Sequence, residues 1–408
     1  MEKLIVNDFV TLKNIELNLN KINILIGPQP SGKSLIAKLL TFIKDIPSFT
    51  IDYIGDEDNS SYADLLESRF KRIFPSYAWE KNIFSILYTN KKFHIHISNQ
   101  GSKVIFNFGN NNFYKLVASG KNYFHKNISA DKAYIDKYIH RRNFATQYSR
   151  DVLGLPFTTP CYIPAGRSFF SSFKNPIKLS ANDINVDYFI SRFGSDYEDT
   201  KAFINIGLFN EQVPPRIKLL IKKLLNGKIE RQENEEWIVS DTNRIKSCHA
   251  SSGQQESIPM VTLLTTWPFS GVSRYSDFVI EEPEAHLFPT SQNRIVSIIS
   301  MIHNQNKSIG YTITTHSPYI ISSINNLLLA SNIATNHPKK SDAVKDIIDE
   351  NEFINFNCIS AYQITEAGSI SILDKENKMI NAEYIDQISN EISSQFDSLL
   401  DIEFGDSE

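Results

Sequence analysis

The residues best suited to chemistry form one glycine-containing stretch near the N-terminus. They are Gly27, Pro28, Gln29, Pro30, Ser31, Gly32, Lys33 and Ser34. The stretch fits G-x-x-x-x-G-K-[ST], in which glycines allow a tight turn and backbone N–H groups surround a phosphate. The lysine of this pattern reaches the terminal phosphates of a nucleoside triphosphate, and the serine hydroxyl binds Mg²⁺. The stretch therefore predicts a site for a nucleoside triphosphate, with Ser34 as a ligand of Mg²⁺.

The elements that this loop needs are present on both sides of it. Residues 21–26 are a short apolar run of strand character, and residues 35–40 begin an amphipathic helix. A strand followed by a helix start brings N–H groups and the positive end of the helix dipole to one point, where an anion binds. This context disfavours the alternative, a strand–helix turn that carries Lys-Ser by chance.

A second group of candidate residues follows the apolar stretch Asp277–Ile280. Glu281 and Glu282 come directly after it, within the string Glu-Glu-Pro-Glu-Ala-His-Leu-Phe-Pro. At the carboxyl edge of a parallel sheet, the first carboxylate can hold Mg²⁺ and the second can orient and deprotonate a water molecule. The alternative is an ordinary charged turn after a strand. The long string, more than the two acids, favours the site.

Two further stretches extend this prediction. His316 leaves the next predicted strand, where a neutral imidazole could hydrogen-bond a γ-phosphate or the hydrolytic water; a structural histidine is the alternative. Ser252, Gly253 and Gln254 open a helix predicted over Glu256–Thr265, and its free N–H groups make a second anion-binding end. Considered alone, this helix start is an N-cap, since no phosphate within one copy of the chain is expected near it.

Composition excludes several classes of protein. The chain has 408 residues, of which 41% are hydrophobic and 22% charged, as in ordinary globular proteins. Its net charge of −4 gives no overall positive field, so DNA binding would need local basic patches. The candidates for such patches are 132–150 and 216–231, and the alternative is that these residues form solvated helix faces. Cys161, Cys248 and Cys358 are too far apart in the chain to suggest disulfides or a zinc site. With no secretory signal and no apolar run of membrane length, we expect a cytoplasmic protein without membrane contact.

Strand and helix signals alternate on both sides of a long middle segment, which predicts an α/β core with a mostly parallel sheet. The middle contains a predicted β-meander at 82–108 and a polar, mainly helical part. We expect five parts: the N-terminal core with the loop at 1–50, an inserted β/α subdomain at 51–155, a return strand at 156–180, a helical lobe at 181–250 and the C-terminal core at 251–408.

Taken in order, these motifs resemble the ATP-binding-cassette (ABC) superfamily, and the strings look like its branch containing the OLD, RecF and SMC-type ATPases. The resemblance covers 1–50 and about 240–375. It implies ATP as the nucleotide, Ser252-Gly253-Gln254 as the signature motif, Glu281-Glu282 as the Walker B pair and His316 as the switch histidine. It also implies a head-to-tail dimer, in which each ATP lies between one phosphate-binding loop and the signature of the other copy.

Several positions depart from the family pattern. Pro30 stands where many members have glycine, Glu281 where most have aspartate, and Gln254 replaces the second glycine of the signature. The glutamine that the family has after the strand at 161–164 is absent, and that segment ends in Arg167. We expect Arg167 either to replace it as a cation that contacts phosphate or base, or to form a structural salt bridge.

The part of the chain after His316 contains no D-x-D and resembles the end of an ATPase head. It therefore favours a stand-alone ATPase over a fusion to a Toprim nuclease, which the OLD nucleases have. The resemblance extends to the ATPase subunits of anti-phage systems such as PARIS and Septu, which implies control of a separately encoded effector, a nuclease. Two alternatives stay open: a RecF-like ATP-dependent DNA-binding repair factor, and an ATP-bound scaffold or sensor with slow turnover.

Overall fold

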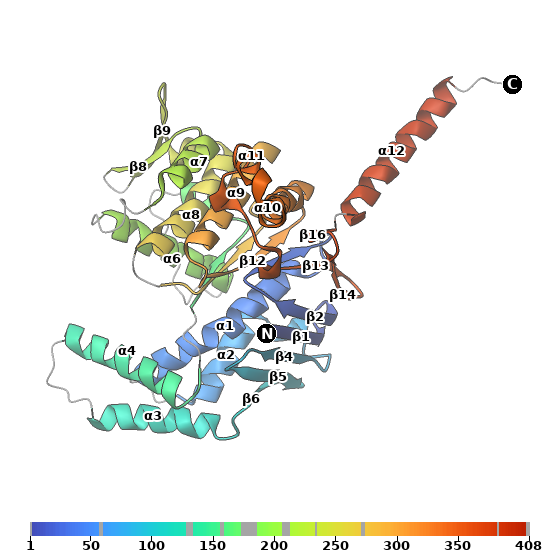
Figure 1. Cartoon of the computed structure of the whole chain (residues 1–408). Coiled ribbons are helices and arrows are strands. Elements are labelled where there is room, and N and C mark those ends of the chain that lie inside the picture. The colour runs from blue at the N-terminus through green and yellow to red at the C-terminus, as the bar shows by residue number, and fades with distance from the viewer. Residues whose placement is uncertain are drawn as a thin grey trace.

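Two β-sheets with helices packed between and around them form the framework of the molecule (Figure 1). The structure is a computed structural model, and it describes residues 2–56, 60–127, 134–155, 159–172, 186–205, 213–232, 235–270, 274–381 and 383–404. The larger sheet has six strands and the second has five. The basic positions Lys132, Lys137, Arg141 and Arg142 lie outside the side chains that the structure describes.

The six-stranded sheet is the α/β core that the sequence predicts. Every strand in it is parallel to its neighbours except β14, which pairs antiparallel with β13. All residues of the central strands β3 and β12 are buried, as is usual for parallel strands that are covered on both faces. In spatial order the strands are β14 (Gly368–Ser371), β13 (Ile359–Thr365), β3 (Ile22–Ile26), β12 (Gly310–Thr315), β11 (Asp277–Glu281) and β7 (Pro160–Ile163).

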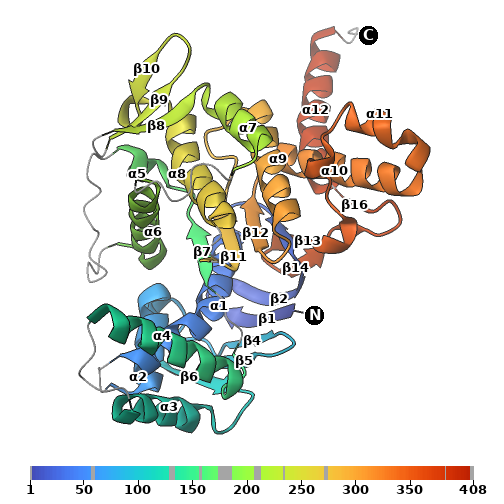
Figure 2. The ribbon, with the colours of Figure 1, turned by 60° about the vertical axis from the view of Figure 1, so that its left-hand side comes forward.

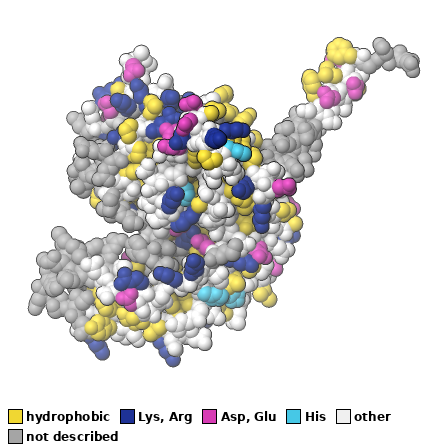
Figure 3. Space-filling model, in the orientation of Figure 1, with side chains coloured by type: hydrophobic (Ala, Val, Ile, Leu, Met, Phe, Trp, Pro, Cys, Tyr) yellow, Lys and Arg dark blue, Asp and Glu magenta, His cyan; other side chains and the backbone are white. Residues whose placement is uncertain are grey.

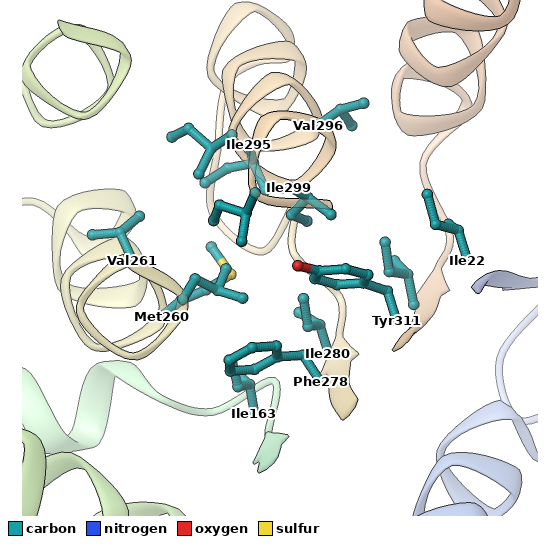
Figure 4. Close-up of a cluster of buried hydrophobic side chains, with 14 of the residues drawn as sticks. Ile22, Ile163, Met260, Val261, Phe278, Ile280, Ile295, Val296, Ile299 and Tyr311 are labelled. Atoms are coloured by element: carbon teal, nitrogen blue, oxygen red, sulfur yellow. The ribbon is translucent and has the colours of Figure 1, made fainter. Parts of the chain in front are cut away.

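Helices cover both faces of this sheet. The helices α8 (Ser252–Thr266), α9 (Pro289–Gln305) and α10 (Pro318–Asn336) share one hydrophobic cluster with the strands (Figure 2). Figure 4 shows side chains of α8 and α9 directed toward those of β11 and β12 in this cluster. Because side chains alternate along a strand, Ile24 belongs to this cluster while Leu25 faces α1 (Lys33–Gly55) on the other side.

The five-stranded sheet is antiparallel throughout and packs on α1 and α2 (Tyr62–Ile73). Its order is β2 (Leu12–Leu19), β1 (Glu2–Phe9), β4 (Ser85–Thr89), β5 (His94–Gln100) and β6 (Lys103–Phe108). The predicted hairpin and the predicted meander are thus one sheet, because β4 pairs with the free edge of β1. The boundary expected at residue 50 falls inside α1, which contacts both sheets.

The part predicted as a helical lobe is helical only in α6 (Tyr188–Asn205) and α7 (Pro215–Leu225) among its described residues. Asn226 ends α7 in the left-handed conformation (φ 49°), and three antiparallel strands follow. These are β8 (Lys228–Gln232), β9 (Glu235–Val239) and β10 (Arg244–Lys246). The predicted lobe is therefore not helical throughout: its part from Lys228 to Lys246 forms strands, and on β9 the buried residues Glu236 and Ile238 alternate with partly buried ones, as in a half-buried strand.

Most of the remaining helices pack on other helices rather than on the sheets. The helices α3 (Phe113–Asn127) and α4 (Tyr134–Asp151) pack beside α1, and the long C-terminal helix α12 (Glu383–Phe404) extends away from both sheets in Figure 1. None of the helices in the described ranges has a stretch long and apolar enough for a bilayer crossing. The short elements are α5 (Ser168–Ser172), α11 (Ser341–Lys345), β15 (Leu373–Asp374) and β16 (Met379–Ile380).

Candidate functional site

Three neighbouring parallel strands end at the same level of the six-stranded sheet. Ile26 at the end of β3 pairs with Thr315 at the end of β12, and Thr314 pairs with Glu281 at the end of β11. The residues that follow these strand ends therefore meet at the carboxyl edge of the sheet, where open α/β sheets bind ligands. They are the phosphate-binding loop, His316 and Glu282.

The two glycines of the loop are required by its geometry. Gly32 precedes α1 with φ 92°, a left-handed conformation that costs glycine no steric strain. A Cβ atom on Gly32 would lie 2.5 Å from Leu12 Cδ2, and one on Gly27 would collide with the carbonyl oxygen of Ile364. The loop is thus held between the β1–β2 turn and β13, and its Ser34 lies exposed in the first turn of α1.

Lys33 places a buried cation inside the loop. Its ammonium group donates hydrogen bonds to the carbonyl oxygens of Gly27 (2.8 Å) and Pro28 (2.9 Å) and to Ser31 Oγ (3.3 Å). Burial lowers the pKa of Lys33 to about 8, and the carboxylates of Glu282 and Glu284 oppose that shift. These acids are therefore close enough to act on the lysine. A bound phosphate would favour its charged form further.

Glu282 and His316 face each other from adjacent strand ends. The Glu282 N–H group donates to the carbonyl oxygen of Thr314 (2.9 Å), and Glu282 Oε1 lies 3.2 Å from His316 Nε2. The backbone of Glu282 has φ 42°, which few residues other than glycine adopt and which persists only where the surroundings hold it. The pair combines a carboxylate that can accept a proton from water with an imidazole that can orient it.

Glu284 fixes the position of His316, a role that the sequence pattern did not reveal. Glu284 Oε1 accepts hydrogen bonds from Thr315 Oγ1 (2.7 Å) and from the N–H group of His316 (2.8 Å). Burial raises the pKa of Glu284. The signal that could have indicated this link is the Glu-x-Glu spacing of Glu282 and Glu284, which places both acids in one turn.

The donor set at the sheet edge fits Mg²⁺. Glu281 is 6% exposed, and its Oε1 atom is buried without a well-formed hydrogen bond. Tyr162 is its neighbour. Burial raises the pKa of Tyr162, and the Glu281 carboxylate raises it further. Mg²⁺ is usually held by one or two carboxylates or hydroxyls together with phosphate oxygens, and Glu281 and Ser34 are donors of these kinds. Within the described ranges, no three His, Cys, Asp or Glu side chains form a metal cluster, which a phosphate-dependent Mg²⁺ site does not require.

The predicted signature residues open α8. Ser251 is the N-cap: its Oγ accepts from the N–H group of Gln254 (3.4 Å), and Gln254 Oε1 accepts from the N–H group of Ser251 (3.0 Å). Gln254 Nε2 also donates to the carbonyl oxygen of Leu225 (2.6 Å), so this side chain is engaged within its own chain. Ser252 is exposed, and no hydrogen bond or ion pair of the described residues joins it to the phosphate-binding loop.

Gly253 brings the start of α8 against the turn that follows β11. A Cβ atom on Gly253 would lie 2.7 Å from the carbonyl oxygen of His286, so only glycine permits this approach. The helix end and the acidic turn are therefore in direct contact within one copy of the chain.

Arg167 lies behind the site rather than in it. Its side chain is fully buried and donates to the carbonyl oxygens of Pro164 (2.9 Å), Glu281 (2.8 Å), Glu282 (3.0 Å) and Glu256 (3.0 Å). Its Nε atom also lies 3.4 Å from Glu256 Oε2. Of the two roles expected for Arg167, this geometry is that of the structural salt bridge, because its donors meet backbone carbonyls and a buried carboxylate.

Comparison with known proteins gives one family match. Residues 167–321, which are less than half of the chain, match the family described as AAA ATPase domain, and this supports ATP binding and hydrolysis. No curated protein matches the chain.

Three solved structures resemble the chain at a distance. An SMC head bound to the C-terminal winged-helix domain of ScpA is 12% identical, with 92% of this chain and 97% of that chain covered and a TM-score of 0.44. The SMC head domain from Thermotoga maritima is 10% identical, with coverages of 91% and 97% and a TM-score of 0.38. The recombination mediator RecF is 10% identical, with coverages of 91% and 97% and a TM-score of 0.33. The assignment to an α/β P-loop fold rests on the parallel sheet and the phosphate-binding loop of the chain itself.

Proposed function

We propose that the chain is an ABC-type ATPase head that binds and hydrolyses ATP and dimerises head-to-tail around it. The observation that carries this proposal is the common level at which β3, β12 and β11 end. That level brings a buried lysine, a carboxylate and an imidazole to one edge of the sheet, in the places where a triphosphate and its attacking water would lie.

Each residue of the site has a role in this reaction. The loop N–H groups and Lys33 hold the β- and γ-phosphates. Ser34 and Glu281 would hold Mg²⁺, which supplies neutralisation of phosphate charge when bound. Glu282 accepts a proton from a water that His316 helps to orient. The water oxygen then bonds to the γ-phosphorus, the bond from phosphorus to the bridging oxygen breaks, and ADP and phosphate leave.

The second copy completes the site. The start of α8 is an exposed helix N-terminus with Ser252 at its first position, and such an end favours an anion. In the head-to-tail dimer this end, with Ser252, Gly253 and the N–H groups of its first turn, contacts the γ-phosphate held by the loop of the other copy. The side chain of Gln254 contributes through the capping of this turn.

We further propose that nucleotide state controls a separately encoded effector, a nuclease, in anti-phage defence. The six-stranded sheet is committed to ATP and to the second copy, so the partner surfaces are β4–β6 and the region from α6 to β10. On the face drawn in Figure 3, Lys and Arg side chains are scattered among acidic and apolar ones rather than gathered in a stripe. This supports a protein partner over DNA on that face.

One specific observation favours the alternative hypothesis of a RecF-like DNA-binding repair factor. The helix α7 carries Arg216, Lys218, Lys222 and Lys223 and no acidic residue. ATP-dependent DNA binding by the isolated chain, without a co-purifying protein, would establish that reading instead. ATP binding without measurable turnover would instead establish the hypothesis of an ATP-bound scaffold or sensor.

The ATP site is tested by Lys33→Ala with Lys38→Ala as the matched control. Both lysines lie on α1, but Lys38 pairs with Asp187 outside the site. We expect Lys33→Ala to lose tight ATP binding in calorimetry and all turnover with Mg²⁺, and Lys38→Ala to keep both. Unchanged ATP affinity in Lys33→Ala would refute the assignment.

A further inference from the structure

Arg167 joins two parts of the chain that the proposed reaction uses separately. The strand β7 lies next to β11 in the sheet, so the residues that leave β7 pass directly beside the turn at Glu281 and Glu282. The guanidinium group of Arg167 binds the carbonyl oxygens of both acids on one side and Glu256 of α8 on the other. Glu256 lies about one turn from the start of α8 at Ser252.

The contacts to the acidic turn hold a backbone conformation that needs support. Glu282 has φ 42°, and its peptide groups are fixed on both sides, by the carbonyl oxygen of Thr314 at its N–H and by Arg167 at its carbonyl oxygen. These two bonds set the direction in which the Glu282 carboxylate leaves the backbone toward His316. Arg167 is thus the only side chain in the described part of the chain that binds the carbonyl oxygens of both acids.

The contacts to α8 hold its first turns in place. Besides the bond to the Glu256 carbonyl and the ion pair with its carboxylate, Ser171 Oγ, on the short helix that follows Arg167, donates to the carbonyl oxygen of Gln255 (2.7 Å). Gly253 also lies close to the carbonyl oxygen of His286, 2.7 Å from where its Cβ atom would be. A displacement of the α8 start therefore cannot occur without moving Arg167 or breaking its bonds.

We propose that Arg167 is a positioning residue that couples the start of α8 to the catalytic carboxylate of Glu282, so that contact of α8 with the second copy's phosphate aligns Glu282 in its own site. The inference rests on the proposed function. The planar guanidinium of Arg167 spans four carbonyl groups in fixed directions, and a lysine ammonium at this position cannot. Arg167 touches neither ATP nor the water and acts through Glu282.

The test compares Arg167→Lys in the parent chain and in the Glu282→Gln background. We expect ATP affinity in calorimetry to stay at the parental value and turnover to fall by about 100-fold, the effect of misplacing a reacting group by about 1 Å. In the Glu282→Gln background, single-turnover hydrolysis should show no further loss. The matched control is Arg231→Lys, because Arg231 is also largely buried and also binds α8, at Thr262 (2.9 Å), but not the acidic turn. It should leave turnover unchanged.

Every result of this test decides. Parental turnover in folded Arg167→Lys, or an equal further loss in the Glu282→Gln background, would overturn the inference while the ATPase assignment stands. A parent chain without ATPase activity would overturn the proposed function and the inference together. If Arg167→Lys does not fold, as judged by circular dichroism, Glu256→Gln decides by the same two criteria. It keeps the backbone contacts and removes only the ion pair between Arg167 and α8.

Discussion

Glu282 is the residue on which the proposed chemistry depends most. Its carboxylate lies beside His316, and its backbone is held by Thr314 and Arg167. We expect Glu282→Gln to bind ATP as the parent does and to lose turnover by about 10²–10⁴-fold, the usual contribution of a general base. Phosphate release and calorimetry measure the two effects. Parental turnover would transfer the role of base to Glu284 or His316.

The pKa of Lys33 predicts how ATP affinity changes with pH. Burial lowers this pKa to about 8, so the ammonium is charged below pH 8 and loses its proton above it. ATP favours the charged form, so we expect affinity to be constant near pH 7 and to fall as pH rises above 8, by up to about tenfold per pH unit. Calorimetry across this range measures the change. The residual affinity of Lys33→Ala should not follow the same dependence.

The strings around Lys33 and Glu282 could be identified from sequence because each is contiguous and chemically specific. The contacts of Arg167 could not, because they depend on β7 lying beside β11, and the bonded residues Arg167 and Glu281 are 114 positions apart. The link from Glu284 to His316 likewise depends on two strands lying side by side, β11 and β12, and the Glu-x-Glu spacing gives only an indirect sign of it. The spacing of residues along the sequence does not show which strands end at the same height in the sheet.

At the scale of elements, the role that we propose for α8 needs a second copy of the chain. An exposed N-terminus with Ser252 at its first position has no phosphate partner within the described residues of its own chain. We expect Ser252→Arg to bind ATP normally and to lose hydrolysis, since in the proposed dimer a bulky cation would replace the hydroxyl that faces the γ-phosphate bound to the other copy. Phosphate release and calorimetry again separate the two.

Mixing Ser252→Arg with Lys33→Ala tests the head-to-tail arrangement directly. Each mixed dimer has one interface built from two intact halves and one built from two altered halves. Hydrolysis should therefore return on mixing, from a single working site in each mixed dimer. If mixed dimers form, as shown by differently tagged copies, and stay inactive, the arrangement is refuted.

The elements themselves could be predicted where their periodicity is strong, as in α9, α10 and β6. The strands within 228–246, inside the lobe expected to be mainly helical, could not be predicted because the charged residues of this region obscure a short alternation, in which Ile238 is the apolar side chain of β9 with little exposure. Trp237, on the central strand of this sheet, is instead covered by Arg244, whose Cζ atom lies 4.4 Å from the ring centroid. Such cross-strand pairs arise only once the strands are adjacent.

At the scale of the molecule, the strands β4–β6 and the helix α12 differ in how much they contribute to the hydrophobic core. The strands β4–β6 share a hydrophobic core with α1, in which Phe42 of α1 packs against Phe106 of β6. On α12 the apolar side chains of Phe396, Leu399, Ile402 and Phe404 are all more than half exposed. In Figure 3 this helix projects from the surface with its apolar and acidic side chains in view.

Two deletions should therefore have opposite effects. Removing 85–108 takes away part of the core under α1, so we expect a large fall in the thermal unfolding midpoint together with loss of ATP binding.

Removing 383–408 deletes no described side chain of the hydrophobic clusters, so the midpoint and ATP affinity should stay at parental values. Scanning calorimetry with and without ATP measures both. An unchanged midpoint in the first deletion would show that the two sheets are independent.

The arrangement of β3 between β13 and β12 sets the order in which the parts of the molecule can form during synthesis. The five-stranded sheet with α1 is complete once residue 108 has left the ribosome. The strand that carries the phosphate-binding loop must wait for partners at 310–315 and 359–365. At 5–20 residues per second, the synthesis of the residues between 108 and 365 takes roughly 13–51 seconds. A growing chain thus has a folded five-stranded sheet before its phosphate-binding loop is fixed in place, and the nucleotide cycle that we propose cannot start before residues 359–365 have been made.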